Sequence, residues 1–306
     1  MKLYEAEQHL KNELKGIYDD QEAANIADLA IEHITQLKRK DRLFKKEEIL
    51  LQEQIEQLHR TIERLKNSEP VQYIMNKAWF YGLELYVDND VLIPRPETEE
   101  LVEWIIKDVK AKGLNVFDKK QTDADVTTQL KIIDVATGSG CIALALKNKM
   151  PKAEVWGCDI SDRALNVARR NGSELDIRVD FQSVDFLDRA QQKHLPSVDI
   201  IVSNPPYVPL KDKNDMRPNV LQYEPHLALF VDDDDPMLFY KALLDFGKHR
   251  LHTGGAFYME VHEDLAQQVK KLFEIEGYQT EIKKDMQGKE RMVKATHPNL
   301  PQGKAI

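Results

Sequence analysis

Hydrophobic side chains recur at helical spacing through the first 68 residues of the chain. Gly16 is the only glycine in this stretch, which contains no proline. Apolar residues three or four positions apart share one face of a helix, where they can pack against a neighbouring helix. The pattern therefore predicts a bundle of several helices. Two stripes illustrate it: Ile26, Leu29 and Ala30, then Leu50, Ile55, Leu58, Ile62 and Leu65.

The pattern changes after the helical segment. Aromatic and β-branched residues alternate around Gly82, which predicts a short hairpin. Residues 93–96 contain two prolines, and we expect a stiff turn because each proline fixes its φ angle. Thr98 is then predicted to be the N-cap of a helix that runs to about Lys110. Residues 112–129 are polar and irregular, and we expect a surface insertion there.

From Lys131 onward, short apolar runs alternate with helical patterns. Alternation of this kind is typical of a doubly wound, mostly parallel α/β sheet. The predicted strands cover residues 131–136, 154–159, 177–182, 198–203, 256–261, 278–283 and 290–295. The predicted helices cover residues 141–149, 163–171 and 265–276.

Composition narrows the classes of function. The 306 residues carry a net charge of −9, which argues against a protein held on nucleic acid by bulk charge. Cys141 and Cys158 both lie in apolar runs without metal-ligand spacing, so we expect reduced core thiols and no metal site. No apolar stretch approaches the roughly 20 residues that span a bilayer, and residues 1–16 lack an apolar signal core. We therefore expect a cytoplasmic protein.

A glycine-rich turn follows the strand at residues 131–136. Gly138 and Gly140 allow a sharp bend and let a ligand approach the backbone closely. Asp159 ends the next strand, where a carboxylate can accept hydrogen bonds from both ribose hydroxyls of an adenosine. Asp185 and Phe186 follow the third strand and are predicted to contact adenine. The predicted cofactor-binding residues are Asp134, Ala136, Thr137, Gly138, Ser139, Gly140, Asp159, Asp185, Phe186 and Asn204.

Two cofactors fit this turn. The spacing Gly138-x-Gly140-x-x-Ala143 also satisfies the dinucleotide fingerprint, so NAD is an alternative. Asp134 lies just before the glycines, and its carboxylate would repel a pyrophosphate but attract an ammonium group. S-adenosylmethionine carries an ammonium group and no phosphate. The charge of Asp134 therefore favours S-adenosylmethionine.

The strand at residues 198–203 runs directly into Asn204-Pro205-Pro206-Tyr207. Two prolines stiffen this backbone, and Asn204 offers an amide oxygen beside the flat ring of Tyr207. Such a site suits a planar NH2 group that awaits an electrophile. We therefore predict that these four residues form the catalytic site.

The glycine turn, Asp159 and the Asn204–Tyr207 segment together resemble the class I S-adenosylmethionine-dependent methyltransferases that act on planar amino groups. That resemblance covers about residues 130–300. A second one covers nearly the whole chain and points to the release factor glutamine methyltransferase family. It is carried by PVQYI at 70–74, FYGLEL at 80–85, VLIPRPETEELVEW at 91–104, YEP at 223–225 and GKER at 288–291.

The resemblance implies a seven-stranded methyltransferase sheet with a small N-terminal helical-bundle domain. It places a helical substrate-recognition domain at 1–76, a hairpin and linker at 77–100, and the methyltransferase domain at 101–306. It further implies that a methyl group passes from S-adenosylmethionine to the glutamine side-chain nitrogen (N5) in the Gly-Gly-Gln motif of class I peptide chain release factors. The implied partner is thus a protein, with neither membrane nor nucleic acid as substrate.

Three alternatives remain open. The acceptor could be a glutamine of a ribosomal protein or an adenine N6 of nucleic acid, or the chain could be a non-catalytic scaffold. The acidic run Asp232–Asp235 departs from the family pattern, and we expect a surface turn that opens a helix at Pro236. Pocket roles are plausible for Arg95, Pro96 and Glu97. By contrast, we expect core or surface roles for His226, Glu260 and His262.

Overall fold

The structure, a computed structural model, describes residues 1–117 and 129–297. The chain divides into two compact units. The first contains Met1–Lys77 and Met216–Tyr223, and the second contains Ala78–Asp215 and Glu224–Ile306. Residues 118–128, the centre of the predicted surface insertion, lie outside the described residues.

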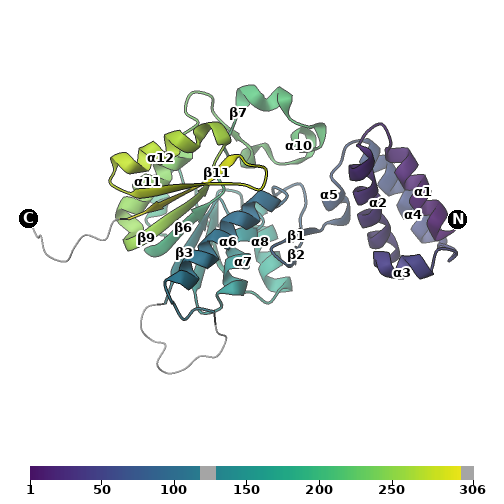
Figure 1. Cartoon of the computed structure of the whole chain (residues 1–306), viewed down its shortest axis with the longest axis horizontal. Coiled ribbons are helices and arrows are strands. Elements are labelled where there is room, and N and C mark those ends of the chain that lie inside the picture. The colour runs from purple at the N-terminus through teal and green to yellow at the C-terminus, as the bar shows by residue number, and fades with distance from the viewer. Residues whose placement is uncertain (118–128, 298–306) are drawn as a thin grey trace, which may run out of the picture. The chain divides into compact units, whose positions relative to one another are not determined.

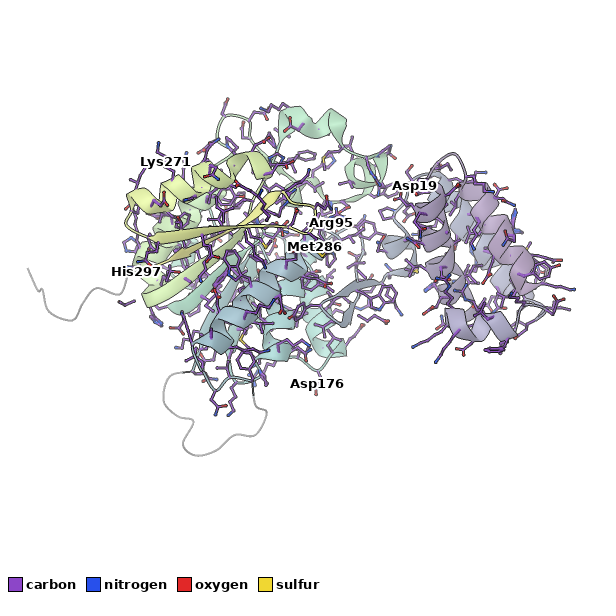
Figure 2. The ribbon with its side chains drawn as sticks, in the orientation of Figure 1. Asp19, Arg95, Asp176, Lys271, Met286 and His297 are labelled. Atoms are coloured by element: carbon purple, nitrogen blue, oxygen red, sulfur yellow. The ribbon has the colours of Figure 1, made fainter. Side chains whose placement is uncertain are left out.

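The first unit is a helical bundle, as predicted. Its apolar faces pack into one core around Leu10, Ile31 and Leu58. Asp19, labelled in Figure 2, caps the second helix because its Oδ1 accepts a hydrogen bond from the backbone N–H of Glu22 at 2.8 Å. The helices are α1 (Leu3–Leu14), α2 (Asp20–Thr35), α3 (Arg39–Phe44), α4 (Gln52–Lys66), α5 (Val71–Met75) and α10 (Pro218–Tyr223).

Helix α10 joins this unit from far along the chain. The Tyr223 hydroxyl donates a hydrogen bond to the Asn67 carbonyl oxygen at 2.9 Å. Arg217 also forms an exposed ion pair with Glu22, at 3.2 Å between Nη1 and Oε1. The helical unit is therefore discontinuous in sequence.

A tight hairpin opens the second unit, which confirms the prediction around Gly82. Strands β1 (Ala78–Phe80) and β2 (Leu83–Leu85) are antiparallel, and Phe80 pairs with Leu83. Tyr81 and Gly82 form the two-residue loop with φ angles of 50° and 81°. Positive φ at both loop positions is the signature of a type I′ turn, which matches the twist of the flanking strands.

A seven-stranded sheet forms the centre of this unit, in the order β10-β11-β9-β6-β3-β4-β5 (Figure 1). Strands β3 to β6 and β9 are mutually parallel, whereas β11 is antiparallel to both of its neighbours. The doubly wound, mostly parallel prediction is confirmed. The strands are β3 (Lys131–Val135), β4 (Glu154–Asp159), β5 (Asp180–Ser183), β6 (Val198–Ser203), β9 (Leu251–Glu260), β10 (Gln279–Lys284) and β11 (Glu290–Thr296).

Helices cover both faces of the sheet (Figure 1). Successive side chains of a strand point to opposite faces, so Ile132 packs under one helical layer and Ile133 under the other. One layer contains α6 (Pro96–Ala111), α7 (Cys141–Lys149) and α8 (Asp162–Glu174). The other contains α11 (Leu238–Arg250) and α12 (Ala266–Ile275).

Across the described ranges, no helix has both the length and the apolar character needed to cross a membrane.

Several predicted boundaries were wrong. Strand β9 begins at Leu251 rather than residue 256, and helix α8 ends at Glu174 rather than residue 171. Helix α6 begins at Pro96 and is preceded by Arg95 as N-cap, because proline suits the first helical position; Thr98 is not the cap. The helix after the acidic turn begins at Leu238 rather than Pro236. Strand β5 covers residues 180–183 instead of 177–182, because pairing with β4 begins only at Asp180.

Candidate active site

A pocket lies where parallel strands β3, β4, β5 and β6 end. The chain leaves β3 in one direction toward β4 and returns to its other side at β6, so the strand order reverses between β3 and β6. Ligands of open α/β sheets bind at such a reversal, outside the carboxyl ends of the strands. The predicted residues that line the pocket are Arg95, Ala136, Thr137, Gly138, Ser139, Asp159, Asp185, Phe186, Asn204 and Pro206.

The turn after β3 owes its shape to two unusual backbone positions. Ala136 and Gly140 have φ angles of 58° and 79°. A Cβ at Gly140 would lie 3.0 Å from the Phe181 ring and 3.1 Å from the Ala168 Cβ, so a side chain has no room there. Gly140 is not among the described residues that line the pocket. It brings α7 close to the sheet, and the left-handed Ala136 turns the chain along the pocket wall.

Asp159 holds the same turn from the neighbouring strand. Its Oδ2 accepts a hydrogen bond from the Gly138 N–H at 2.9 Å, and its Oδ1 accepts one from the Ser161 N–H at 2.9 Å. Burial raises the pKa of the Asp159 carboxyl, and these backbone hydrogen bonds oppose that effect. Each carboxylate oxygen retains an acceptor site, so Asp159 can also accept hydroxyl groups from a ligand in the pocket.

Asp134 lies behind the turn. Its Oδ2 accepts hydrogen bonds from the Thr137 hydroxyl at 2.5 Å and from the Ala143 N–H at 3.2 Å. Oδ1 is buried without a partner among the described residues. Burial raises the pKa of the Asp134 carboxyl to about 7. Asp134 is not among the described residues that line the pocket, and its contacts fasten the turn to α7 from behind the loop.

The charges of the pocket wall favour a cationic ligand. Asp90, Asp159 and Asp185 contribute carboxylates, whereas Arg95 is the one basic residue among the described lining residues. Arg95 is already paired, since its Nη2 lies 2.6 Å from Glu224 Oε1. A sulfonium or ammonium group would be attracted to this wall, whereas a pyrophosphate would be repelled. The residues present therefore fit S-adenosylmethionine better than NAD.

Asn204 and Pro206 line the pocket at the end of β6, and Pro205 and Tyr207 are not among the described lining residues. Nδ2 of Asn204 donates a hydrogen bond to the Thr98 hydroxyl oxygen at 3.2 Å. The Tyr207 hydroxyl donates to Oε1 of Glu260 at 3.1 Å. Burial raises the pKa of the Tyr207 phenol, which therefore stays neutral. Hydrogen bonds thus fix both polar side chains of the Asn204–Tyr207 segment.

Glu260, for which a core or surface role was expected, is buried and lies beside this segment. Glu260 ends β9 and is 1% exposed. Its two carboxylate oxygens accept hydrogen bonds from Thr98 and Tyr207. Burial raises the pKa of Glu260, while these hydroxyls and the charge of Arg291 oppose the rise. Glu260 follows the apolar run at residues 256–259, but an acid at a strand end does not by itself reveal these contacts.

A second buried acid, Glu224, positions the segment before α6. Its Oε1 pairs with Arg95, and its Oε2 accepts a hydrogen bond from the Ile93 N–H at 3.2 Å. Glu224 is 3% exposed, and Arg95, labelled in Figure 2, lines the pocket. Pro96 and Glu97 are not among the described lining residues: Pro96 begins α6 and Glu97 accepts a hydrogen bond from the Gln287 side chain at 2.9 Å.

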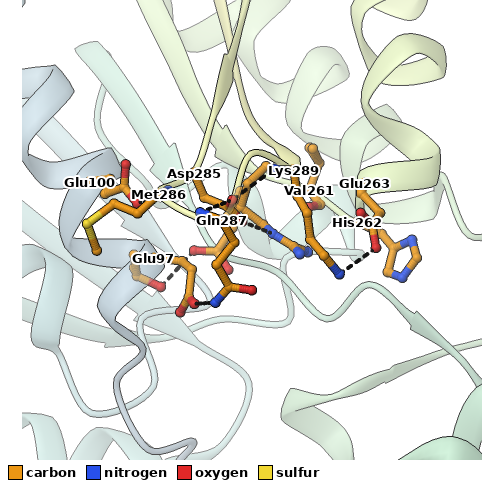
Figure 3. Close-up of polar contacts among 12 residues, drawn as sticks. Glu97, Glu100, Val261, His262, Glu263, Asp285, Met286, Gln287 and Lys289 are labelled. Carbon is orange, nitrogen blue, oxygen red and sulfur yellow. Dashed lines mark hydrogen bonds and ion pairs between the residues drawn. The ribbon is translucent and has the colours of Figure 1, made fainter.

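The turn between β10 and β11 is fastened to the first turn of α6, as Figure 3 shows. The Met286 N–H donates a hydrogen bond to Glu100 at 2.9 Å, next to the Gln287 contact with Glu97. Within the turn, the Arg291 Nε pairs with Asp285 at 3.3 Å. These contacts hold the guanidinium group of Arg291 where its charge acts on both Tyr207 and Glu260.

The acidic turn is tied locally to its own surroundings. Asp235 pairs with Lys241 at 2.7 Å, and Asp233 accepts a hydrogen bond from the Lys211 N–H at 3.0 Å.

In the part of the chain that the structure describes, no group of three or more His, Cys, Asp or Glu side chains could hold a metal ion.

Comparison with known proteins relates both units to one family. Residues 5–75 match the family described as PrmC N-terminal domain, and residues 115–222 match the methyltransferase small domain. A release factor glutamine methyltransferase of Flavobacterium psychrophilum is 39% identical over 92% of this chain and 94% of its own. The chain belongs to the release factor glutamine methyltransferase family. A second member, the release factor glutamine methyltransferase of Bacteroides thetaiotaomicron, is 37% identical over 94% of this chain and 97% of its own.

A solved structure supports the fold assignment. The catalytic domain of hMettl16, in complex with a MAT2A 3′UTR hairpin, matches 74% of this chain and 79% of its own with a TM-score of 0.53. Its sequence identity is 15%, so the likeness concerns the fold alone. The family expected from the sequence is thus confirmed, and with it the class of enzyme, a methyltransferase.

Proposed function

We propose that this enzyme transfers a methyl group from S-adenosylmethionine to the side-chain N5 of the glutamine in the Gly-Gly-Gln motif of class I release factors. The observation that carries the proposal is the match to relatives of that name along 92–94% of the chain. The pocket supports it independently, because Asn204 presents an amide beside the acidic wall.

The residues around the pocket divide the binding of S-adenosylmethionine between them. Asp159 would accept the ribose hydroxyls, and Asp185 and Phe186 would contact the adenine. The glycine turn, with Asp134 behind it, would receive the amino-acid part. When bound, S-adenosylmethionine supplies an electrophilic methyl group, so the protein has only to bind and orient the acceptor.

The Asn204–Tyr207 segment would orient the glutamine amide. An amide nitrogen is a poor nucleophile because its lone pair is delocalised into the carbonyl. The Asn204 Oδ1 and the Pro205 carbonyl would accept the two amide hydrogens and raise the electron density on nitrogen. Pro206 keeps the turn rigid, and the Tyr207 ring, held by Glu260, forms a flat wall. No strong base is needed beforehand, since the nitrogen loses its proton readily once it is methylated.

We further propose that the helical unit recognises the protein partner. Its surface carries exposed apolar side chains, among them Leu43, Phe44, Ile49 and Leu51. The net charge of the chain and the absence of a basic stripe in its sequence speak against a nucleic-acid substrate.

One labelling experiment separates the candidate acceptors. The enzyme is incubated with methyl-labelled S-adenosylmethionine and, in parallel, with purified release factor, the same factor with the motif glutamine replaced by glutamate, ribosomal proteins and bulk RNA. We expect label in the unmodified release factor alone. Label in RNA alone or in a ribosomal protein alone would reject the proposal, and no label anywhere would favour a non-catalytic scaffold.

Replacing the ribose-binding carboxylate should weaken cofactor binding. We expect Asp159→Ala to lose about 1.5–3 kcal/mol of binding free energy, the scale of hydrogen bonds to a charged group. Titration calorimetry with S-adenosylmethionine measures the loss. Asp180→Ala is the control, because Asp180 is an exposed carboxylate on the next strand and does not line the pocket. Equal affinities for the Asp159 variant and the unmodified enzyme would rule out the ribose role.

A further inference from the structure

Three side chains from separate segments form a hydrogen-bonded chain beside the pocket. Thr98 lies in the first turn of α6, Glu260 ends β9, and Asn204 follows β6. The Thr98 hydroxyl lies 2.7 Å from Glu260 Oε2, and the Asn204 Nδ2 lies 3.2 Å from the Thr98 hydroxyl oxygen. Thr98 and Glu260 are 2% and 1% exposed, so water has little access to the contact between them.

Hydrogen-bond chemistry gives this chain a single direction. The Thr98 hydroxyl donates its only hydrogen to Oε2 of Glu260, so it has none left to donate to Asn204. Thr98 can then only accept a hydrogen bond from Asn204. The NH2 group of Asn204 therefore turns toward Thr98, and its Oδ1 is left to face the pocket.

We propose that Thr98 and Glu260 are positioning residues that fix the Asn204 amide with its oxygen toward the acceptor nitrogen. This inference rests on the proposed function, in which the Asn204 Oδ1 accepts a hydrogen from the substrate amide. An Asn204 side chain turned by 180° would place its own NH2 against the substrate NH2, and two donors cannot pair. Orientation of Asn204 is therefore a condition for productive binding.

Packing alone does not require these two polar groups. Valine has nearly the shape of threonine, and it would fill the space at Thr98 without a hydroxyl to satisfy. Thr98 is also not the cap of α6, since Arg95 holds that position. A buried carboxylate such as Glu260 is costly to fold, and the raised pKa of Glu260 reflects that cost. Costly buried polar groups next to a pocket are typical of functional sites.

Burial raises the pKa of Glu260, and besides Thr98 two neighbours oppose that rise. Tyr207 donates a hydrogen bond to Oε1 at 3.1 Å, and Arg291 contributes a positive charge. The negative charge of Glu97 raises the pKa of Glu260. Because Tyr207 occupies Oε1, the carboxylate cannot turn away from Thr98 without losing a second hydrogen bond. The same acid thus holds both Tyr207 and, through Thr98, Asn204.

A double-mutant cycle tests the inference with the full-length enzyme and purified release factor. We expect Thr98→Val to lower kcat roughly 10–100-fold. This is less than the loss expected when the Asn204 amide itself is removed, because Thr98→Val only frees that amide to turn. Thr98 lines the pocket, but valine keeps nearly the same shape in its wall, so the affinity for S-adenosylmethionine should stay within about twofold in calorimetry. In an Asn204→Ala background, Thr98→Val should cost nothing further, because Thr98 acts only through Asn204. Thr98→Ser keeps the hydroxyl and should restore most of kcat.

Thr280→Val is the matched control. The Thr280 hydroxyl donates to Glu274 Oε1 at 2.7 Å, the same kind of bond at the same length, but on the outer strand β10. This variant should retain full activity. If Thr98→Val proves unstable, Glu260→Gln replaces it in the cycle. Its amide can point a hydrogen toward Thr98 and so allow the chain to reverse. Because Glu260 also holds Tyr207, we expect a loss of roughly threefold or more that becomes smaller, without vanishing, in the Asn204→Ala background.

The outcomes distinguish the two proposals. A normal kcat in Thr98→Val, or losses that simply multiply in the double variant, would overturn the positioning role while leaving the proposed function intact. A failure of Thr98→Ser to restore kcat would also overturn it. Near-normal methylation by Asn204→Ala alone would instead reject the proposed role of Asn204, and with it this inference.

Discussion

Asn204→Ala is expected to lower kcat for release factor methylation by roughly 100-fold or more, the scale of losing one preorganised polar contact. The variant removes the oxygen that would accept an amide hydrogen, while the pocket walls at Asp159 and the glycine turn remain. Cofactor affinity should therefore stay close to that of the unmodified enzyme. Single-turnover labelling from S-adenosylmethionine to release factor measures the chemical step, and calorimetry measures the affinity.

The control for this variant is Asn166→Ala. Asn166 is exposed on α8 and does not line the pocket, so its replacement should leave methylation unchanged. If the Asn204 variant methylated at a near-normal rate, the catalytic assignment of the Asn204–Tyr207 segment would fail. If it lost cofactor affinity instead of turnover, Asn204 would belong to the cofactor site alone.

Gly140→Ala is expected to destabilise the protein by roughly 2–5 kcal/mol, the sum of a left-handed backbone cost and overpacking. The φ angle of 79° disfavours any residue with a Cβ. The new Cβ would also meet the Phe181 ring and Ala168 at 3.0 and 3.1 Å. Either α7 shifts away from the sheet or the turn deforms, and the turn carries the Gly138 N–H that bonds to Asp159. Denaturant unfolding with and without S-adenosylmethionine should reveal a loss of both stability and affinity.

Gly277→Ala separates the backbone cost from the overpacking. Gly277 has a φ angle of 86°, but nothing lies within 4 Å of its added Cβ. This variant should lose only about 1–2 kcal/mol, the backbone cost, and should bind the cofactor normally. Equal losses in the two variants would show that the contact with Phe181 does not limit the space at Gly140.

The sequence predicted the central elements well, because they are the most strongly patterned. Strands β4 and β6 and helix α7 have the predicted bounds, since long apolar runs between glycine and proline leave few other arrangements. The start of α6 was less predictable. Thr98 is a good cap by residue type, yet its hydroxyl bonds to Glu260, which is 162 positions away in sequence. Local patterns carry no information on such a contact.

The site was predicted in part for the same reason. Asp159 and Asn204 lie at strand ends, and the carboxyl ends of parallel strands converge on one edge of a sheet, so sequence order placed them together. The buried acids Glu224 and Glu260 act by supporting other residues, and a lone glutamate has no pattern that reveals such a role. Asp134 was expected on the pocket wall, but its place behind the turn depends on hydrogen bonds to Thr137 and Ala143 that only the folded chain shows.

The discontinuity of the helical unit has a consequence for protein synthesis. Residues 1–77 leave the ribosome early, whereas α10, which completes their unit, follows only after Met216. In the sheet, by contrast, β9 pairs with β6, which is made earlier, and β11 then pairs with β9. The core of the bundle is nevertheless complete early, because its described members all lie in residues 3–75 and α10 contributes no buried side chain. A fragment cut at residue 77 should therefore keep the core of the domain and lose only the exposed contacts that Arg217 and Tyr223 make.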